Sequence, residues 1–139
     1  MINPPSLGTS ETGGNVKTKL WTGRVLSALA VLFMLFDGIS HVIKPAPVVD
    51  AFSRLGFPLS LAIPLGVIEF VCVAVYAIPR TSILGAILLT GYLGGAVATH
   101  MRVRDPLFDT LFPFIIGALV WGGLFLRDSG LRALIPFKS

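Results

Sequence analysis

The stretch Thr90–Asp105, with the sequence TGYLGGAVATHMRVRD, decides how the rest of the chain is interpreted. It begins inside an apolar run, ends at charged residues, and has small residues at four-residue spacing: Gly91, Gly95 and Thr99. On a helix this spacing predicts a smooth stripe against which neighbouring helices could pack closely. Tyr92, Ala96 and His100 form a second stripe, one residue further round, that carries polar atoms. We therefore predict a helix that holds two others through its glycines and presents His100 to their polar groups.

The composition is that of a membrane protein. Of the 139 residues, 54% are hydrophobic and 13% are charged, whereas soluble domains carry about a quarter charged residues. Four apolar segments are each long enough to cross a hydrocarbon core of ~30 Å, which takes ~20 helical residues. These segments are residues 20–42, 59–78, 82–100 and 110–126. The sequence predicts an all-α fold, a four-helix transmembrane bundle with short loops, in one membrane domain over residues 17–139.

Two segments outside the predicted spans have their own patterns. Residues 1–16 are polar and rich in Gly, Ser, Thr and Pro, so they cannot bury a core and are predicted to form a disordered leader. Between the first two spans, Val49, Phe52 and Leu55 are spaced for a short amphipathic helix. Such a helix would rest on the membrane surface or act as a lid.

The basic residues gather at the ends of the predicted spans, where Lys and Arg favour the cytoplasmic side. Seven fall on the side of the N-terminus: Lys17, Lys19, Arg24, Arg80, Arg127, Arg132 and Lys138. Four fall on the opposite side: Lys44, Arg54, Arg102 and Arg104. This bias predicts a multi-pass protein of the plasma membrane with both termini in the cytoplasm. The single cysteine, Cys72, allows no intramolecular disulfide.

Ionisable residues lie within the predicted spans. Asp37 and His41 are four residues apart in the first span and share a face. Glu69 lies near the middle of the second span, and His100 ends the third. A lone charge at mid-membrane costs ~3 kcal/mol even on a lenient scale, and lipid offers no hydrogen-bond partner. We predict that these four groups meet in one buried cluster, which favours a functional site over a purely structural contact.

Four motifs support a family resemblance: LLTGYLGGAVATHMR at residues 88–102, DGxxH at 37–41, GVIE at 66–69 and WGGLxLRD at 121–128. With these motifs the chain resembles the DoxX-like family of small bacterial membrane proteins over about residues 20–136. The resemblance implies a four-helix bundle in the bacterial inner membrane. It also implies a link to quinone or thiol redox chemistry, because the family name comes from a thiosulfate:quinone oxidoreductase subunit. The polar-site residues that it implies are Asp37, His41, Glu69, Thr99, His100 and Arg102.

The leading hypothesis is a redox-linked membrane protein, an oxidoreductase subunit, that binds a quinone or a similar lipophilic ring between its helices. The predicted catalytic residues are Asp37, Glu69 and His100. His100 would hydrogen-bond a ring carbonyl, while Glu69 and the Asp37–His41 pair would pass protons to or from the outer side of the membrane. The residues predicted to bind the ligand are His41, Tyr92, Thr99 and Arg102. Electrons would come from a bound cofactor or from a partner redox subunit.

Two other classes of function stay open. His41 and His100, with the carboxylates, offer ligands for zinc, iron or copper, or axial ligands for a haem. Alternatively, the protein is a non-enzymatic subunit or scaffold, and the stripe through Gly91 and Gly95 faces a partner or a second copy of the chain in a homo-oligomer. The sequence has no nucleotide-binding loop, hydrolase triad or nucleic-acid motif, so the lipid bilayer is an expected partner and nucleic acid is not.

Overall fold

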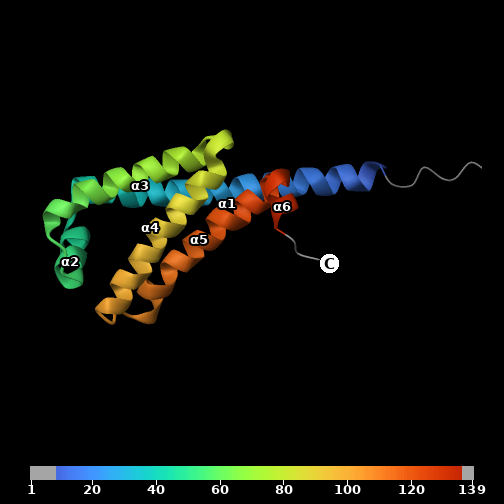
Figure 1. Ribbon diagram of the computed structural model, residues 1–139. Helices are drawn as coiled ribbons and strands as arrows, with labels where there is room; N and C mark the ends of the chain where they lie inside the picture. Colours follow the sequence, from blue (N-terminus) through green and yellow to red (C-terminus); the bar gives the residue numbers. More distant parts are fainter. Residues whose placement is uncertain (1–8, 136–139) are drawn as a thin grey trace, which may run out of the picture.

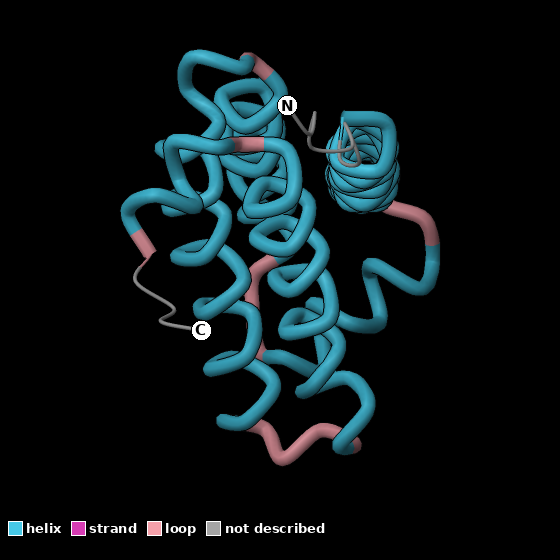
Figure 2. The backbone as a smooth tube through the Cα atoms, turned by 90° about the vertical axis from the view of Figure 1, so that its right-hand side faces the viewer, coloured by secondary structure: helices cyan, strands magenta, loops and turns pink. Residues whose placement is uncertain are grey.

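The computed structural model describes residues 9–135, in which every regular element is a helix (Figure 1). The α-helices are α1 (Thr9–Ile43), α2 (Ala46–Leu55), α3 (Ala62–Ala77), α4 (Ser82–Arg102), α5 (Leu107–Arg127) and α6 (Ser129–Leu134). Single 3-10 turns, η1 (Leu59–Leu61) and η2 (Pro79–Thr81), lead directly into α3 and α4. Figure 2 shows that only short loops separate the helices. The predicted all-α fold is confirmed.

Within the described residues, four helical segments are long and apolar enough to cross a membrane, as the sequence predicts. They are Gly13–Ile43, Leu59–Ala77, Pro79–Arg102 and Leu107–Arg127. Large apolar side chains stay on the outside of the bundle, including Phe36, which is 70% exposed, and Phe114, which is 61% exposed. Such a surface is unfavourable in water and is matched by lipid tails. The protein is therefore a multi-pass integral membrane protein.

The start of the first helix differs from the predicted disordered leader over residues 1–16. Helix α1 begins at Thr9, so residues 9–16 are helical, while residues 1–8 lie outside the described part of the chain. Gly13 and Gly14 each disfavour a helix by about 1 kcal/mol. Each residue added to an existing helix nevertheless gains a backbone hydrogen bond without a new nucleation step. Propagation from the apolar span thus outweighs the local sequence preference.

The four spans run alternately up and down and form two pairs. Helix α1 is paired with α3, and α4 is paired with α5. The two pairs are joined by contacts of α3 with α4 and of α1 with α5, and the α1–α5 contact is the most extensive between any two of these helices. Figure 1 shows that the α4–α5 pair crosses the α1–α3 pair near α6 and diverges from it towards α2. At the crossing, a Cβ added to Gly23 would lie 2.8 Å from the carbonyl oxygen of Gly123. Side chains at those two positions would push α1 and α5 apart.

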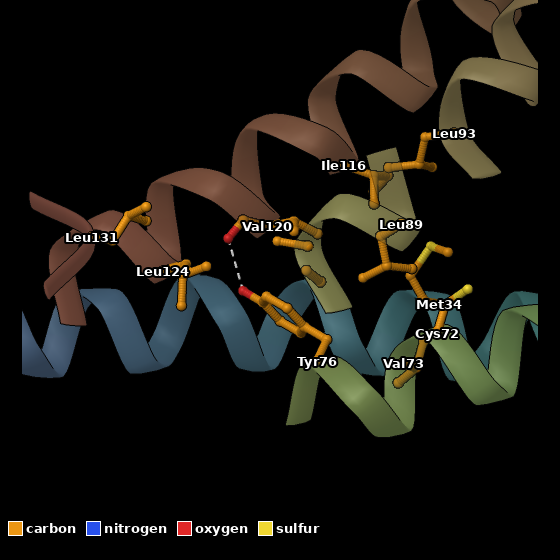
Figure 3. Packing of buried hydrophobic residues seen from close by; sticks show 12 residues of the cluster. Met34, Cys72, Val73, Tyr76, Leu89, Leu93, Ile116, Val120, Leu124 and Leu131 are labelled. Carbon is orange, nitrogen blue, oxygen red and sulfur yellow. Dashed lines mark hydrogen bonds between the residues drawn. The ribbon is translucent and has the colours of Figure 1, made fainter. Parts of the chain in front are cut away.

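The apolar core lies where the two pairs cross (Figure 3). Its fully buried members come from all four spans and include Met34, Tyr76, Leu89, Val120 and Leu124. Leu131 of α6 is 5% exposed and extends the core at this end. The tight packing at this crossing fixes the angle at which the helix pairs separate towards α2.

The glycines that pack α4 against its neighbour are not those of the predicted stripe. A Cβ added to Gly85 would collide with the backbone of Tyr76 in α3. At Gly91 and Gly95, no atom of another residue lies within 4 Å of an added Cβ. The prediction that Gly91 and Gly95 pack helices together within the chain is therefore wrong. The physical reason is that α4 diverges from the α1–α3 pair, so its backbone comes close to α3 at Gly85 and not at Gly91 or Gly95.

A directed chain of hydrogen bonds ties the helices together beside the core. The Tyr76 hydroxyl donates to the carbonyl oxygen of Val120 at 2.8 Å, so its oxygen accepts from Ser27 Oγ at 2.9 Å. Arg127 Nε donates to Ser27 Oγ at 3.0 Å, and its Nη2 donates to Ser82 Oγ at 3.3 Å. The guanidinium also lies over the Tyr76 ring, 5.3 Å from its centre. One arginine of α5 thereby holds α1, α3 and α4.

We expect Tyr76→Phe to lower the stability of the bundle by ~1–3 kcal/mol, because it leaves the Val120 carbonyl and the Ser27 hydroxyl without their buried partner. Thermal unfolding in detergent measures the loss. Thr18→Val is the control, since the Thr18 hydroxyl bonds only to Gly14 of its own helix at an exposed position. Equal melting temperatures for Tyr76→Phe and wild type would contradict a stabilising role for the chain.

Candidate functional site

A cavity of about 640 Å³ opens between the two helix pairs at the end where they diverge, beneath α2. Most of its wall is apolar: Phe33, Met34, Pro47, Val48, Ala51, Phe52, Leu55, Phe57, Leu65, Ile68, Leu93, Ala96, Phe108, Phe112, Pro113 and Ile116. The polar side chains in the wall are Asp37, His41, Tyr92, Thr99, His100 and Asp109. The predicted amphipathic helix exists as α2, and its buried Phe52 packs edge-on to the His41 ring, 5.7 Å between centres. Helix α2 forms the part of the cavity wall that is called the lid below.

Three of the predicted site residues meet beside this cavity: Asp37 and His41 line it, and Glu69 is buried behind them. His41 Nδ1 lies 3.8 Å from Asp37 Oδ2 and 3.7 Å from Glu69 Oε2. The Tyr92 hydroxyl donates to Glu69 Oε2 at 3.1 Å. Glu69 is fully buried, and its Oε1 has no hydrogen-bond partner among the described residues. A buried carboxyl with a free oxygen needs a proton, a cation or a bound polar group to offset its lost hydration.

The cluster forms because α1 and α3 approach closely at two glycines. A Cβ added to Gly66 would lie 3.1 Å from the carbonyl oxygen of Gly38 and 3.1 Å from His41 Cβ. Glu69 follows Gly66 by three residues, so it lies on the same face of α3 and points at α1. Asp37 and His41 share the facing side of α1 through their four-residue spacing. The DGxxH and GVIE motifs thus combine a polar group with the glycine that lets it reach its partner.

The hydrogen bonding of His41 assigns its tautomer. Nδ1 lies 2.8 Å from the carbonyl oxygen of Asp37 in the preceding turn. Because a carbonyl oxygen can only accept, Nδ1 carries a hydrogen and donates it. In the neutral ring, Nε2 is therefore a hydrogen-bond acceptor, and it has no partner among the described residues. His41 can take a proton from a ligand hydroxyl or, once protonated, donate one to a ligand carbonyl.

His100 lines the same cavity but is not joined directly to the other three ionisable groups. Its Nδ1 is 2.6 Å from Asp105 Oδ2, and Asp105 Oδ1 is 3.3 Å from Arg54 Nε. The predicted direct meeting of His100 with Asp37, His41 and Glu69 is therefore wrong. The reason is that the loop after α4 turns back and supplies a nearer carboxylate. The cavity, rather than hydrogen bonds, brings His100 and the cluster to one site.

The two other predicted ligand-binding residues of α4 differ in placement. Thr99 lines the cavity, but its hydroxyl donates to the carbonyl oxygen of Gly95 in its own helix. Arg102 does not line the cavity. Its guanidinium donates to the carbonyl oxygen of Leu55 and lies over the Phe57 ring, 5.6 Å from the centre. The prediction that Arg102 contacts the ligand therefore gains no support, because this side chain holds the end of α2.

Three further residues belong to the site and were not predicted there from the sequence: Phe52, which packs on His41, and Asp105 and Arg54, which lie beside His100. Asp105 lies outside the predicted spans, and Arg54 counts there only as a topology signal. A local signal for Asp105 does exist, since it follows His100 by five residues, directly after the end of a helix. No comparable signal places Arg54 beside it, because that contact depends on how α2 folds over the bundle.

The ligand atoms of Asp37, His41 and Glu69 all lie within 4.8 Å of one another, close enough to surround a metal ion. The donor set of two carboxylates and one imidazole suits a divalent transition metal. The fit is incomplete in one respect: Nδ1, the His41 nitrogen that lies between the carboxylates, already donates to the Asp37 carbonyl. His100 is not part of this group among the described residues, so the predicted pair of imidazole ligands is not assembled.

Over the described residues, the fold and the site together define a four-span integral membrane protein with an apolar cavity and an Asp/His/Glu cluster beside it, of which Asp37 and His41 line the cavity. The sequence profile of the DoxX-like family matches residues 25–123, which is most of the chain, and the protein belongs to this family. Neither a curated protein nor a solved structure matches the chain.

Proposed function

We propose that the cavity binds a quinone or a similar lipophilic ring and that the Asp37–His41–Glu69 cluster exchanges protons with it. The observation that carries the proposal is the cavity itself, whose volume of about 640 Å³ lies within the ~300–1,000 Å³ typical of small-molecule sites. Its apolar wall suits a ring and an alkyl tail, and the few polar groups would bind the ring oxygens. A lipophilic ligand would reach this depth from the bilayer.

The cluster offers a short route for protons. His41 Nε2 is the free end of an imidazole whose Nδ1 lies within 4 Å of both carboxyl groups. A proton taken up at Nε2 would create an imidazolium, which an ionised carboxylate at this distance stabilises. The imidazolium would then release its Nδ1 hydrogen to Asp37 Oδ2, 3.8 Å away, which leaves a neutral ring with the new hydrogen on Nε2. The Asp37 side chain is 43% exposed, so it could pass a proton on to water or to a second group at the cavity mouth. Conversion between a quinone and its hydroquinone takes two protons and two electrons, and we propose that a partner redox subunit carries the electrons.

We expect His41→Ala to weaken binding of a decyl-substituted benzoquinone to the protein in lipid nanodiscs by at least about tenfold, or ~1.4 kcal/mol. A hydrogen bond to an ionisable group has this magnitude. Calorimetry or quenching of tryptophan fluorescence measures the affinity. Ser40→Ala is the matched control, since Ser40 is next in sequence, bonds only to the Phe36 carbonyl of its own helix and does not line the cavity. Wild-type affinity in a folded His41→Ala, Glu69→Gln double variant would end the proposal.

A metal ion is the second candidate, favoured by the approach of three ligand atoms to within 4.8 Å. Loading would require His41 to release the Asp37 carbonyl or to turn Nε2 towards the carboxylates. Elemental analysis and an absorption spectrum of protein purified without chelators test for a bound metal ion and for a bound haem at the same time. A colourless, metal-free protein that stays folded would remove both.

We propose further that the protein lies in the plasma membrane with both termini in the cytoplasm. The support is the seven-to-four distribution of basic residues between the two ends of the bundle. Helix α1 begins and α6 ends at the same end of the molecule, so both segments lie on one side (Figure 1). The cavity would then lie in the outer half of the membrane.

A further inference from the structure

The C-terminal end of α4 holds a buried carboxylate against an imidazole. Asp105 Oδ2 lies 2.6 Å from His100 Nδ1, shorter than the ~2.7–2.9 Å usual for a charge-assisted N–H···O bond. The Asp105 side chain is 5% exposed and that of His100 is 21% exposed, so water competes little for the bond. A carboxylate oxygen accepts, so the hydrogen lies on Nδ1 of His100.

The backbone builds this pair through the way the helix ends. The amide N–H of Asp105 donates to the carbonyl oxygen of His100, and that of Arg104 donates to the carbonyl oxygen of Met101, both at 3.1 Å. These two bonds make a Schellman motif, in which Arg104 takes the left-handed conformation with φ of 57°. The motif folds the chain back on the last helical turn. Asp105 therefore contacts His100 twice: its backbone amide caps the His100 carbonyl, and its side chain reaches the His100 ring.

Contacts from the lid fix the other side of the carboxylate. Arg54 of α2 lies with Nε 3.3 Å from Asp105 Oδ1, which leaves Oδ2 for His100. In the opposite direction, Arg102 of α4 reaches back to the Leu55 carbonyl at the end of α2. The lid and the imidazole are thus joined through Asp105.

We propose that Asp105 is a positioning residue for His100: it keeps the hydrogen on Nδ1 and turns Nε2 to the cavity as the atom that exchanges a proton with the ligand. The inference rests on the proposed ligand site, since His100 lines the same cavity as Asp37 and His41. Neutral His100 then accepts a hydrogen bond from the hydroxyl of a reduced ring, and protonated His100 donates one to the carbonyl of an oxidised ring. The ligand class is therefore a ring with at least one exchangeable oxygen function.

The first test needs no ligand. The chain has 2 histidines, so ¹⁵N-histidine spectra of the tag-free protein in nanodiscs contain two rings, and His41→Gln assigns them. At alkaline pH, where imidazole is neutral, we expect wild-type His100 to carry its hydrogen on Nδ1. Asp105→Ala should move the hydrogen mainly to Nε2, the form that free histidine prefers, and Asp105→Asn should restore Nδ1–H because its amide oxygen also accepts.

The second test compares a decyl-substituted benzohydroquinone with its dimethyl ether, which has no hydroxyl to donate. We expect wild type to bind the hydroquinone at least tenfold more tightly, and Asp105→Ala to remove most of that difference while Asp105→Asn keeps it. A wild-type His100 with its hydrogen on Nε2, or an Asp105→Ala protein with unchanged spectra, would overturn the positioning role. If His100 has the expected tautomer but neither ring binds, the proposed ligand site fails and the positioning of His100 stands.

Discussion

Gly85→Leu should lower the stability of the bundle by at least ~3 kcal/mol and prevent the native assembly of α3 with α4. The collision is with the Tyr76 backbone rather than with the end of a flexible side chain. Tyr76 is itself fully buried and hydrogen-bonded, so it cannot move away without breaking the bonds that its hydroxyl makes. Thermal unfolding in detergent, with size-exclusion chromatography to detect aggregation, measures the effect.

Gly94→Leu is the matched control on the same helix. An added Cβ at Gly94 has no neighbour within 4 Å, and Gly94 does not line the cavity. Replacing glycine by leucine within a helix favours the helix by about 1 kcal/mol, so this variant should unfold at or above the wild-type temperature. A Gly85→Leu protein as stable as Gly94→Leu would show that α4 does not cross α3 at this residue.

Gly95→Leu should leave the bundle folded and weaken binding of the decyl-substituted benzoquinone by at least about tenfold, or ~1.4 kcal/mol. Gly95 lines the cavity, and an added Cβ meets no atom within 4 Å. A leucine side chain would therefore extend into the space that the ligand is proposed to occupy. Titration of the folded protein in nanodiscs gives the affinity.

Gly94→Leu again isolates the effect, since it adds the same side chain one residue away on a face that does not line the cavity. It should bind the benzoquinone like wild type. Equal affinities for Gly95→Leu and Gly94→Leu would place any bound ring outside this cavity. If Gly95→Leu instead abolished a complex with another subunit while the folded monomer persisted, the stripe would be an external interface, as the scaffold hypothesis holds.

Part of the candidate site was within reach of the sequence. Asp37 and His41 face the same way because four residues make about one helical turn, and the expense of a charge in lipid turns them towards Glu69. The structure brings these three groups together. Helix periodicity could not predict the partner of His100. Arg104 has a left-handed backbone conformation, which turns the chain back so that Asp105 reaches His100, and a turn of this kind has no periodic pattern in the sequence.

The sequence by itself determined the membrane-spanning helices and their number, since span length and hydropathy are properties of each segment alone and every backbone polar group must be satisfied within the bilayer. Only the tertiary structure decided which face of α4 packs and which borders the cavity. Gly85 and Gly95 would both permit another helix to approach closely. Only Gly85 packs against another helix, because the helix pairs cross near Gly85 and have separated at Gly95, which borders the cavity. This separation depends on the angle at which the helix pairs cross. The angle is determined by contacts between segments that are far apart in the sequence.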